Sequence, residues 1–177
     1  SLENIADINM LNTTNVIDMS NMFKDCVALK ELNLKFNTEK VTNMSRMFQA
    51  CTGLNSLEIK SFNTTNVKDM TKMFEFYDLT ELDISGLKTD NVLYMLDMFA
   101  DMKNVISLDV SGFNTMNVID MAGMFYGCSQ LKELNVKNFN TQNVIDYSFQ
   151  FYECENLISL DVSKFNTNEK HRFFLYV

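Results

Sequence analysis

The sequence contains a single histidine, no proline and no tryptophan. One histidine excludes any chemistry that needs two of them. No apolar run approaches the roughly 18 residues that a membrane helix requires, so we expect no direct insertion into a membrane. The N-terminus lacks the succession of basic, apolar and small residues that marks a signal peptide, so targeting does not indicate a compartment.

Positive charge is also scarce. The chain has 15 basic and 23 acidic residues, which gives a net charge of −8, and the acidic residues are spread along its length. No basic stripe is available to neutralise phosphates, which argues against nucleic acid as a partner and against binding to anionic lipid. The length of 177 residues predicts a single domain, residues 1–177.

A repeat of 25 or 26 residues runs through the chain. Each copy contains a valine, in most copies after an asparagine, and a phenylalanine stands seven residues after each valine. The valines are Val16, Val41, Val67, Val92, Val118 and Val144. The phenylalanines are Phe23, Phe48, Phe74, Phe99, Phe125 and Phe151.

Other positions recur in register with these two. Methionine fills the third and the sixth position after the valine in five of six copies, and the tenth position is Cys26, Cys51, Tyr77, Met102, Cys128 or Cys154. A short Leu-x-x-Leu-x-aliphatic element follows, as in Leu131–Val136. Its alternation of apolar and polar residues with period two predicts a strand.

The valine-to-cysteine segment predicts a short helix. At about 100° per residue its apolar positions share one stripe, and the preceding asparagine is a good N-cap. One helix and one strand per copy cannot bury their apolar faces alone, so successive copies must stack, equivalent residue on equivalent residue. The predicted fold is α/β, with a parallel sheet on one face and short helices on the other.

The repeat resembles a known family. Leu-x-x-Leu-x-Val is similar to the core of leucine-rich repeats, and the pattern from Phe113 to Cys128 resembles the BspA-like repeat of bacterial surface proteins. The resemblance implies a right-handed leucine-rich-repeat-type solenoid of about six full repeats. It also implies a location at the cell surface or outside the cell, with adhesion or host-protein binding as the function.

The two ends depart from the pattern. Ala6–Ile8 matches Leu82–Ile84, which predicts an additional strand at the start of the stack. Residues 168–177 abandon the repeat, and their apolar stretch, Phe173–Val177, is expected to cap the last copy. The alternatives are a disordered tail and a contact with a neighbouring molecule or with a further segment. Open strand edges invite pairing, so end-to-end assembly is the second function that we consider.

The exposed positions of the predicted sheet carry many carboxylates. They form an acidic face that could bind a basic ligand or a cation, or could simply keep the sheet solvated. A flat ladder of single carboxylates does not supply the converging oxygens of a calcium site, so no metal and no cofactor are expected. The candidate ligand-binding residues on this face are Glu58, Glu81, Asp83, Asp109, Glu133 and Asp161.

A second candidate surface is aromatic. Tyr126 and Tyr152 occupy the same repeat position in adjacent copies, and Tyr94 and Phe149 stand where most copies have polar residues. These four side chains could form a patch that binds a protein or glycan partner, such as a host matrix protein, or they could pack flat over neighbouring copies.

Nothing in the sequence indicates an enzyme. The four cysteines share one repeat position with Tyr77 and Met102, which favours free buried thiols over disulfides or a zinc site. His171, in the divergent tail, is expected to be solvated. No Ser-His-Asp order, phosphate-binding loop or HExxH motif is present.

Overall fold

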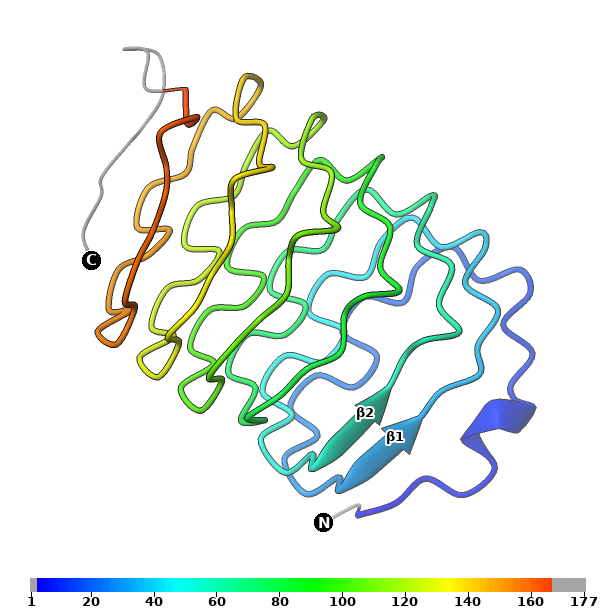
Figure 1. Cartoon of the computed structure of the whole chain (residues 1–177). Coiled ribbons are helices and arrows are strands. Elements are labelled where there is room, and N and C mark those ends of the chain that lie inside the picture. The colour runs from blue at the N-terminus through cyan, green and yellow to red at the C-terminus, as the bar shows by residue number, and fades with distance from the viewer. Residues whose placement is uncertain (1–2, 167–177) are drawn as a thin grey trace.

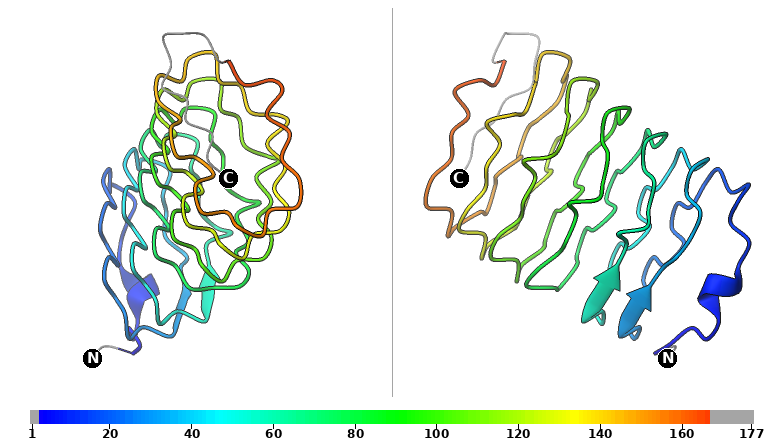
Figure 2. Two further views of the ribbon diagram at one scale, coloured as in Figure 1. Left: turned by 90° about the vertical axis from the view of Figure 1, so that its left-hand side faces the viewer. Right: turned by 45° about the vertical axis from the view of Figure 1, so that its right-hand side comes forward.

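The computed structural model describes residues 3–166, which wind as a stack of coils with one coil per repeat (Figures 1 and 2). We number the coils 1 to 6 from the six repeat valines. The chain contains the 3₁₀ helix η1 (Ile8–Met10) and the strands β1 (Glu31–Asn33) and β2 (Ser56–Glu58). The two strands are parallel, and Glu31 lies opposite Ser56.

The predicted continuous sheet is wrong. Within the described residues only β1 and β2 form a sheet. A ladder of single parallel bridges from Asp18 to Asp146 joins all six coils, whereas on the side of β1 and β2 single bridges join only Ser107, Glu133 and Ser159 of coils 4, 5 and 6. The gap falls at coil 3, which is one residue short between Tyr77 and Leu79. Side chains cross this gap instead, as Lys60 Nζ lies 3.1 Å from Asp83 Oδ2.

The predicted helices are also wrong. In each coil the segment from the first methionine to the cysteine is a row of overlapping turns, which we call the turn row. In coil 1 the amide N–H groups of Met22 and Lys24 donate to the carbonyls three residues earlier, while those of Met19, Asn21 and Phe23 donate to coil 2. A helix would have kept all of these bonds within the coil. The α/β fold with helices on one face is therefore overturned.

Left-handed backbone conformations make the turn row possible. The fifth and ninth residues after each valine have φ between 50° and 69°, so the chain reverses its curvature every four residues. Few side chains accept this conformation without strain, and in coil 5 both positions are glycine. The residues concerned are Asn21, Asp25, Arg46, Ala50, Lys72, Phe76, Asp97, Asp101, Gly123, Gly127, Phe149 and Glu153.

The stacking of equivalent residues is confirmed. The six repeat phenylalanines form one column of nearly parallel rings, with neighbouring centroids 5.7 to 5.9 Å apart. The valine, methionine and cysteine positions are fully buried in coils 2 to 5, where Tyr77 and Met102 fill the cysteine position. The apolar stripe was therefore assigned to the correct side of the chain, although its backbone is not helical.

A column of buried threonines joins the coils on another side. The Thr89 hydroxyl donates to the Asn114 carbonyl at 3.0 Å and accepts from the Asn114 amide at 2.8 Å, one coil further along. Thr38, Thr64 and Thr115 make the same pair of bonds to the next coil. Each hydroxyl thus satisfies two backbone groups of the next coil.

The N-terminal strand predicted at Ala6–Ile8 is wrong, since Asp7 has φ of 56° and η1 begins at Ile8. The expectations for the tail and for His171 lie outside the described residues. All four cysteines are free thiols, and Cys51, Cys128 and Cys154 each donate to a backbone carbonyl of the preceding coil. In residues 3–166 no helix is long and apolar enough to cross a membrane.

Candidate functional site

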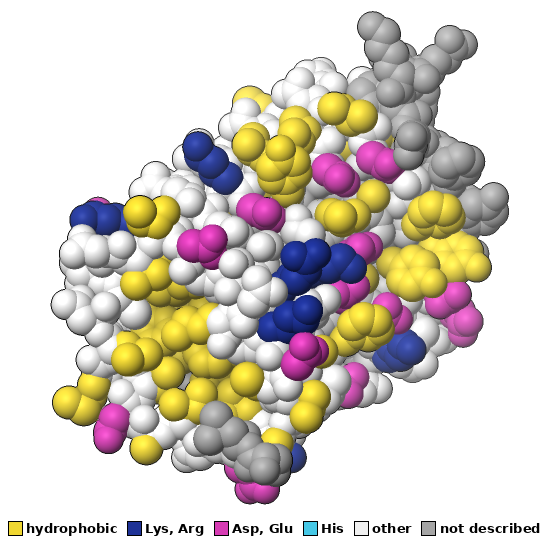
Figure 3. Space-filling view, turned by 180° about the vertical axis from the view of Figure 1, so that it is seen from behind, with side chains coloured by type: hydrophobic (Ala, Val, Ile, Leu, Met, Phe, Trp, Pro, Cys, Tyr) yellow, Lys and Arg dark blue, Asp and Glu magenta, His cyan; other side chains and the backbone are white. Residues whose placement is uncertain are grey.

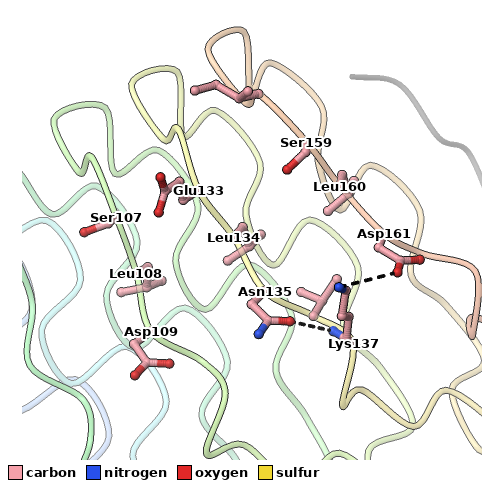
Figure 4. A pocket seen from close by; sticks show the side chains of 12 residues that line it. Ser107, Leu108, Asp109, Glu133, Leu134, Asn135, Lys137, Ser159, Leu160 and Asp161 are labelled. Carbon is pink, nitrogen blue, oxygen red and sulfur yellow. Dashed lines mark hydrogen bonds and ion pairs between the residues drawn. The ribbon is translucent and has the colours of Figure 1, made fainter.

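The acidic face contains exposed carboxylates that the coils hold on one side of the stack. Asp109, Glu133 and Asp161 line a shallow concavity of about 650 Å³ over coils 4 to 6 (Figure 4). Glu58 lines a separate depression next to η1. Glu81 and Asp83 lie between them on coil 3, whose residues 79–84 form no bridge to either neighbouring coil.

The aspartates of this face have a structural role within their own coils. Asp83, Asp109 and Asp161 each accept a hydrogen bond from the backbone N–H two residues later, which closes a tight turn. These bonds to Ser85, Ser111 and Ser163 hold the pKa of each carboxyl below its ordinary value. Ligand binding by the acidic face stays a prediction. The structure shows a role for its aspartates that needs no ligand, since they close turns in their own coils.

We expect the Asp83 carboxyl to titrate with a pKa of about 2, below the ordinary value of 3.8, because hydrogen bonds from Ser85 and the nearby Lys60 favour its charged form. Its contribution to stability is therefore present above the ordinary pKa and is lost as the pH falls through about 2. A carboxyl-detected NMR titration measures this value. The Lys60→Met substitution should raise the pKa of Asp83 toward 3.8 without reaching it, because the hydrogen bonds from Ser85 remain. A wild-type midpoint at 3.8 or higher would contradict the lowered pKa.

Three of the four aromatic residues predicted to form a patch are in contact with one another. Tyr126 and Tyr152 stack with ring centroids 5.4 Å apart and an interplanar angle of 16°, and Phe149 meets Tyr152 edge-on at 6.1 Å. Tyr94 lies elsewhere, in a bridge ladder between Asp69 and Asp120, with 41% of its surface exposed. The predicted patch is thus smaller by one residue.

These rings form one wall of a surface depression of about 500 Å³, which we call the aromatic groove. It lies over the turn rows of coils 4 to 6, on the face opposite β1 and β2, where hydrophobic and acidic side chains lie close together (Figure 3). The groove is lined by Leu96, Asp97, Ala122, Gly123, Tyr126, Ser148, Phe149 and Tyr152.

Gly123 forms the floor of the groove because it has no side chain. A Cβ atom at this position would collide with Asp97 Oδ1, and one at Gly127 would lie 2.7 Å from Asp101 Oδ1. The carboxylates of coil 4 thus fold over the glycines of coil 5. The sequence analysis missed Asp97 and Gly123, and the signal that could have found them is the pair of glycines four residues apart in one coil.

The groove is electrostatically negative. Lys72 Nζ lies 2.7 Å from Glu75 Oε1 and 3.2 Å from Asp97 Oδ2, so one cation faces two carboxylates. Burial raises the pKa of Asp97 despite the neighbouring Lys72. The pKa of Tyr126 is raised by the charge of Glu153 above all, with smaller contributions from burial, Asp101 and Asp97.

No part of the described chain gathers the donors of a metal centre. In residues 3–166 no group of three or more His, Cys, Asp and Glu side chains could hold an ion. Burial raises the pKa of Cys51 to about 12 and that of Cys154 to about 11, which disfavours the thiolate form that binds metals and reacts.

The comparison with family models identifies the chain. The model described as "Mycoplasma protein of unknown function, DUF285" matches residues 1–107 and again residues 74–174. The chain belongs to the DUF285 family. The two matches overlap, as expected when a repeat can be aligned in more than one register, and together they cover nearly the whole DUF285 chain.

The predicted membership of the BspA-like leucine-rich repeat family is therefore wrong. The DUF285 repeat shares the Leu-x-x-Leu-x-aliphatic spacing with leucine-rich repeats, but its backbone forms turn rows and has almost no sheet. Neither a search of curated proteins nor a search of solved structures found a match to the DUF285 chain.

Proposed function

We propose that this chain is a non-catalytic scaffold that binds a macromolecular partner, a protein or a glycan, through the aromatic groove. The observation that supports the proposal is the groove itself, in which three aromatic rings line a depression together with Asp97, whose carboxylate fits over Gly123. Tyrosine and phenylalanine supply large contact area with few rotatable bonds, and they are enriched at recognition sites.

The acidic face is the weaker candidate for the binding site, because several of its carboxylates already have partners within the chain. Its aspartates close turns in their own coils, and Asp83 also pairs with Lys60. Adhesion at a bacterial cell surface, or action in a secreted form, stays a prediction, because the DUF285 description names neither a location nor a partner.

We expect a partner from a panel of host matrix proteins and glycans to bind the wild-type chain. Binding should fall at least about tenfold when Tyr126 and Tyr152 are both replaced by alanine, since hot-spot aromatics each contribute on the order of 2 kcal/mol. Surface plasmon resonance against each panel member measures this.

The matched control reverses charge on the other face, with Asp83→Lys and Asp109→Lys combined. This variant should bind as the wild-type chain does. Loss of binding in the control alone would move the site to the acidic face, and a panel with no binder at all would contradict the proposal.

End-to-end assembly is the second candidate function, and the first coil favours it. In coils 1 to 5 alternate N–H groups of the turn row donate to the following coil. No coil precedes coil 1 within residues 3–166, and there the carbonyls of Asp18, Ser20, Met22 and Lys24 have no backbone donor. Apolar side chains flank this edge, with Ile17 60% and Val27 57% exposed. A row of acceptors beside apolar surface is suited to receiving another coil.

If this edge drives assembly, the mass measured by light scattering should rise with protein concentration. Replacing Ile17 and Met22 by lysine should abolish the increase, because charge on an open edge opposes pairing. A constant monomer mass at high concentration in the wild-type chain would rule out this function and leave the first proposal intact.

A further inference from the structure

The aromatic groove pairs flat rings with a carboxylate whose second oxygen is available. Asp97 Oδ2 faces Lys72 at 3.2 Å, whereas Asp97 Oδ1 lies over the Gly123 backbone and accepts no hydrogen bond within residues 3–166. One oxygen of this carboxyl group is thus held by Lys72, and the other lies against Gly123 in the lining of the groove.

The surroundings of this oxygen select the charge of a ligand. Glu75, Asp97 and Asp101 outnumber Lys72, and Lys103 Nζ approaches Asp101 only at 3.7 Å with an exposed side chain. The raised pKa of the neighbouring Tyr126 reports the same negative field. An anionic ligand would be repelled here, and a neutral one would leave Asp97 Oδ1 desolvated and unpaired.

The rings select the shape of the ligand. A cation over the face of a tyrosine or phenylalanine is attracted by the ring, and its alkyl stem packs on the same apolar surface. Leu96 and Ala122 extend this apolar lining beyond the rings. The groove therefore offers a place for a charged head next to Asp97 and a place for an aliphatic stem along the rings.

We propose that the aromatic groove binds a lysine or arginine side chain of a partner protein. This inference rests on the proposed function and names the chemistry of its partner. A protein segment is favoured over a small free cation because the groove is shallow and spans three coils, which leaves room for the residues that flank the basic side chain.

An NMR titration of the full chain tests this inference. The probes are the peptide acetyl-Ala-Ala-Arg-Ala-Ala-amide, the same peptide with lysine, and the same peptide with citrulline, which has the shape of arginine without its charge. The amide signal of Gly123 reports on the lining of the groove, and that of Gly127 reports on the adjacent Tyr126 and on Tyr152, to whose carbonyl it donates. We expect both basic peptides to shift these signals to saturation and the citrulline peptide to bind at least about tenfold more weakly, which corresponds to about 1.4 kcal/mol.

Two variants locate the effect. Asp97→Asn keeps the size of the side chain and should weaken binding of the arginine peptide at least about tenfold. The remaining affinity should depend less on salt concentration. Tyr126→Leu keeps an apolar contact and removes the ring, and it should weaken the peptide severalfold. Asp109→Asn, on the acidic face, is the matched control and should leave binding unchanged.

Each alternative outcome is decisive. Equal binding of the citrulline peptide, or an unchanged affinity in Asp97→Asn, would overturn the inference and leave the groove as a site for neutral ligands, so the proposed function would stand. Absence of any peptide binding, combined with a panel partner that depends on Tyr126 and Tyr152, would likewise overturn only the inference. Arginine binding that Asp97→Asn abolishes would support it even if the panel contained no partner.

Discussion

Replacing Phe99 by alanine is expected to lower the free energy of unfolding by about 3–5 kcal/mol. Phe99 is 0% exposed and stacks between Phe74 and Phe125, with ring centroids 5.7 and 5.8 Å away. Truncation removes contacts with both neighbouring coils at once, and the close-packed column can refill the space only by moving backbone that the turn rows hold in place. Chemical denaturation followed by circular dichroism measures the loss.

The matched control lies in the same coil. Asp109→Ala removes an exposed carboxylate whose hydrogen-bond partner is the Ser111 amide, and it should change the free energy of unfolding by only a small fraction of the Phe99→Ala effect. Equal losses in the two variants would mean that the inner and outer positions of the repeat are wrongly assigned.

The buried and exposed positions could be predicted because the repeat shows each position six times. A position such as that of Met44, which is methionine in five copies and never charged, has to face the core in any stacked arrangement. The phenylalanine column follows from the same argument, since equal spacing in the sequence places equal side chains over one another.

The backbone within each coil could not be predicted in the same way. A helix and a turn row both bury the residues 0, 3, 6, 7 and 10 positions after the valine, so the apolar stripe does not distinguish them. What distinguishes them is the destination of alternate N–H groups, which lies in the next coil. Asn, Asp and Gly favour left-handed conformations, but Arg46 and Lys72 at the same positions conceal that signal.

One contact of the candidate site, between two tyrosine rings, could be predicted from the sequence. Tyr126 and Tyr152 share a repeat position, so their contact followed from the stacking. Asp97 and Gly123 share the fifth position after the valine, and Asp97 enters the groove only because Gly123, one coil further along, has no side chain. Glycine fills this position in coil 5 alone among the six coils, so the contact has no periodicity and the repeat does not reveal it.

Replacing Thr89 by valine is expected to lower the free energy of unfolding by about 2–3 kcal/mol, although the two side chains have nearly the same shape. The Thr89 hydroxyl is buried and bonds to both the carbonyl and the amide of Asn114. Valine would leave these two backbone groups without a partner in a place that an apolar methyl group fills, and each such group costs about 1–3 kcal/mol. The loss should come without a change of core volume, which separates it from the effect of Phe99→Ala.

Two further variants isolate the hydroxyl of Thr89. Thr89→Ser retains the hydroxyl and removes one methyl group, so it should cost less than Thr89→Val, which retains the methyl volume and removes the hydroxyl. Thr65→Val changes an exposed threonine of the preceding coil and should be close to neutral. If Thr89→Val were as mild as Thr65→Val, water would be satisfying the Asn114 groups. The threonine column would then not be what joins the coils where the sheet is absent.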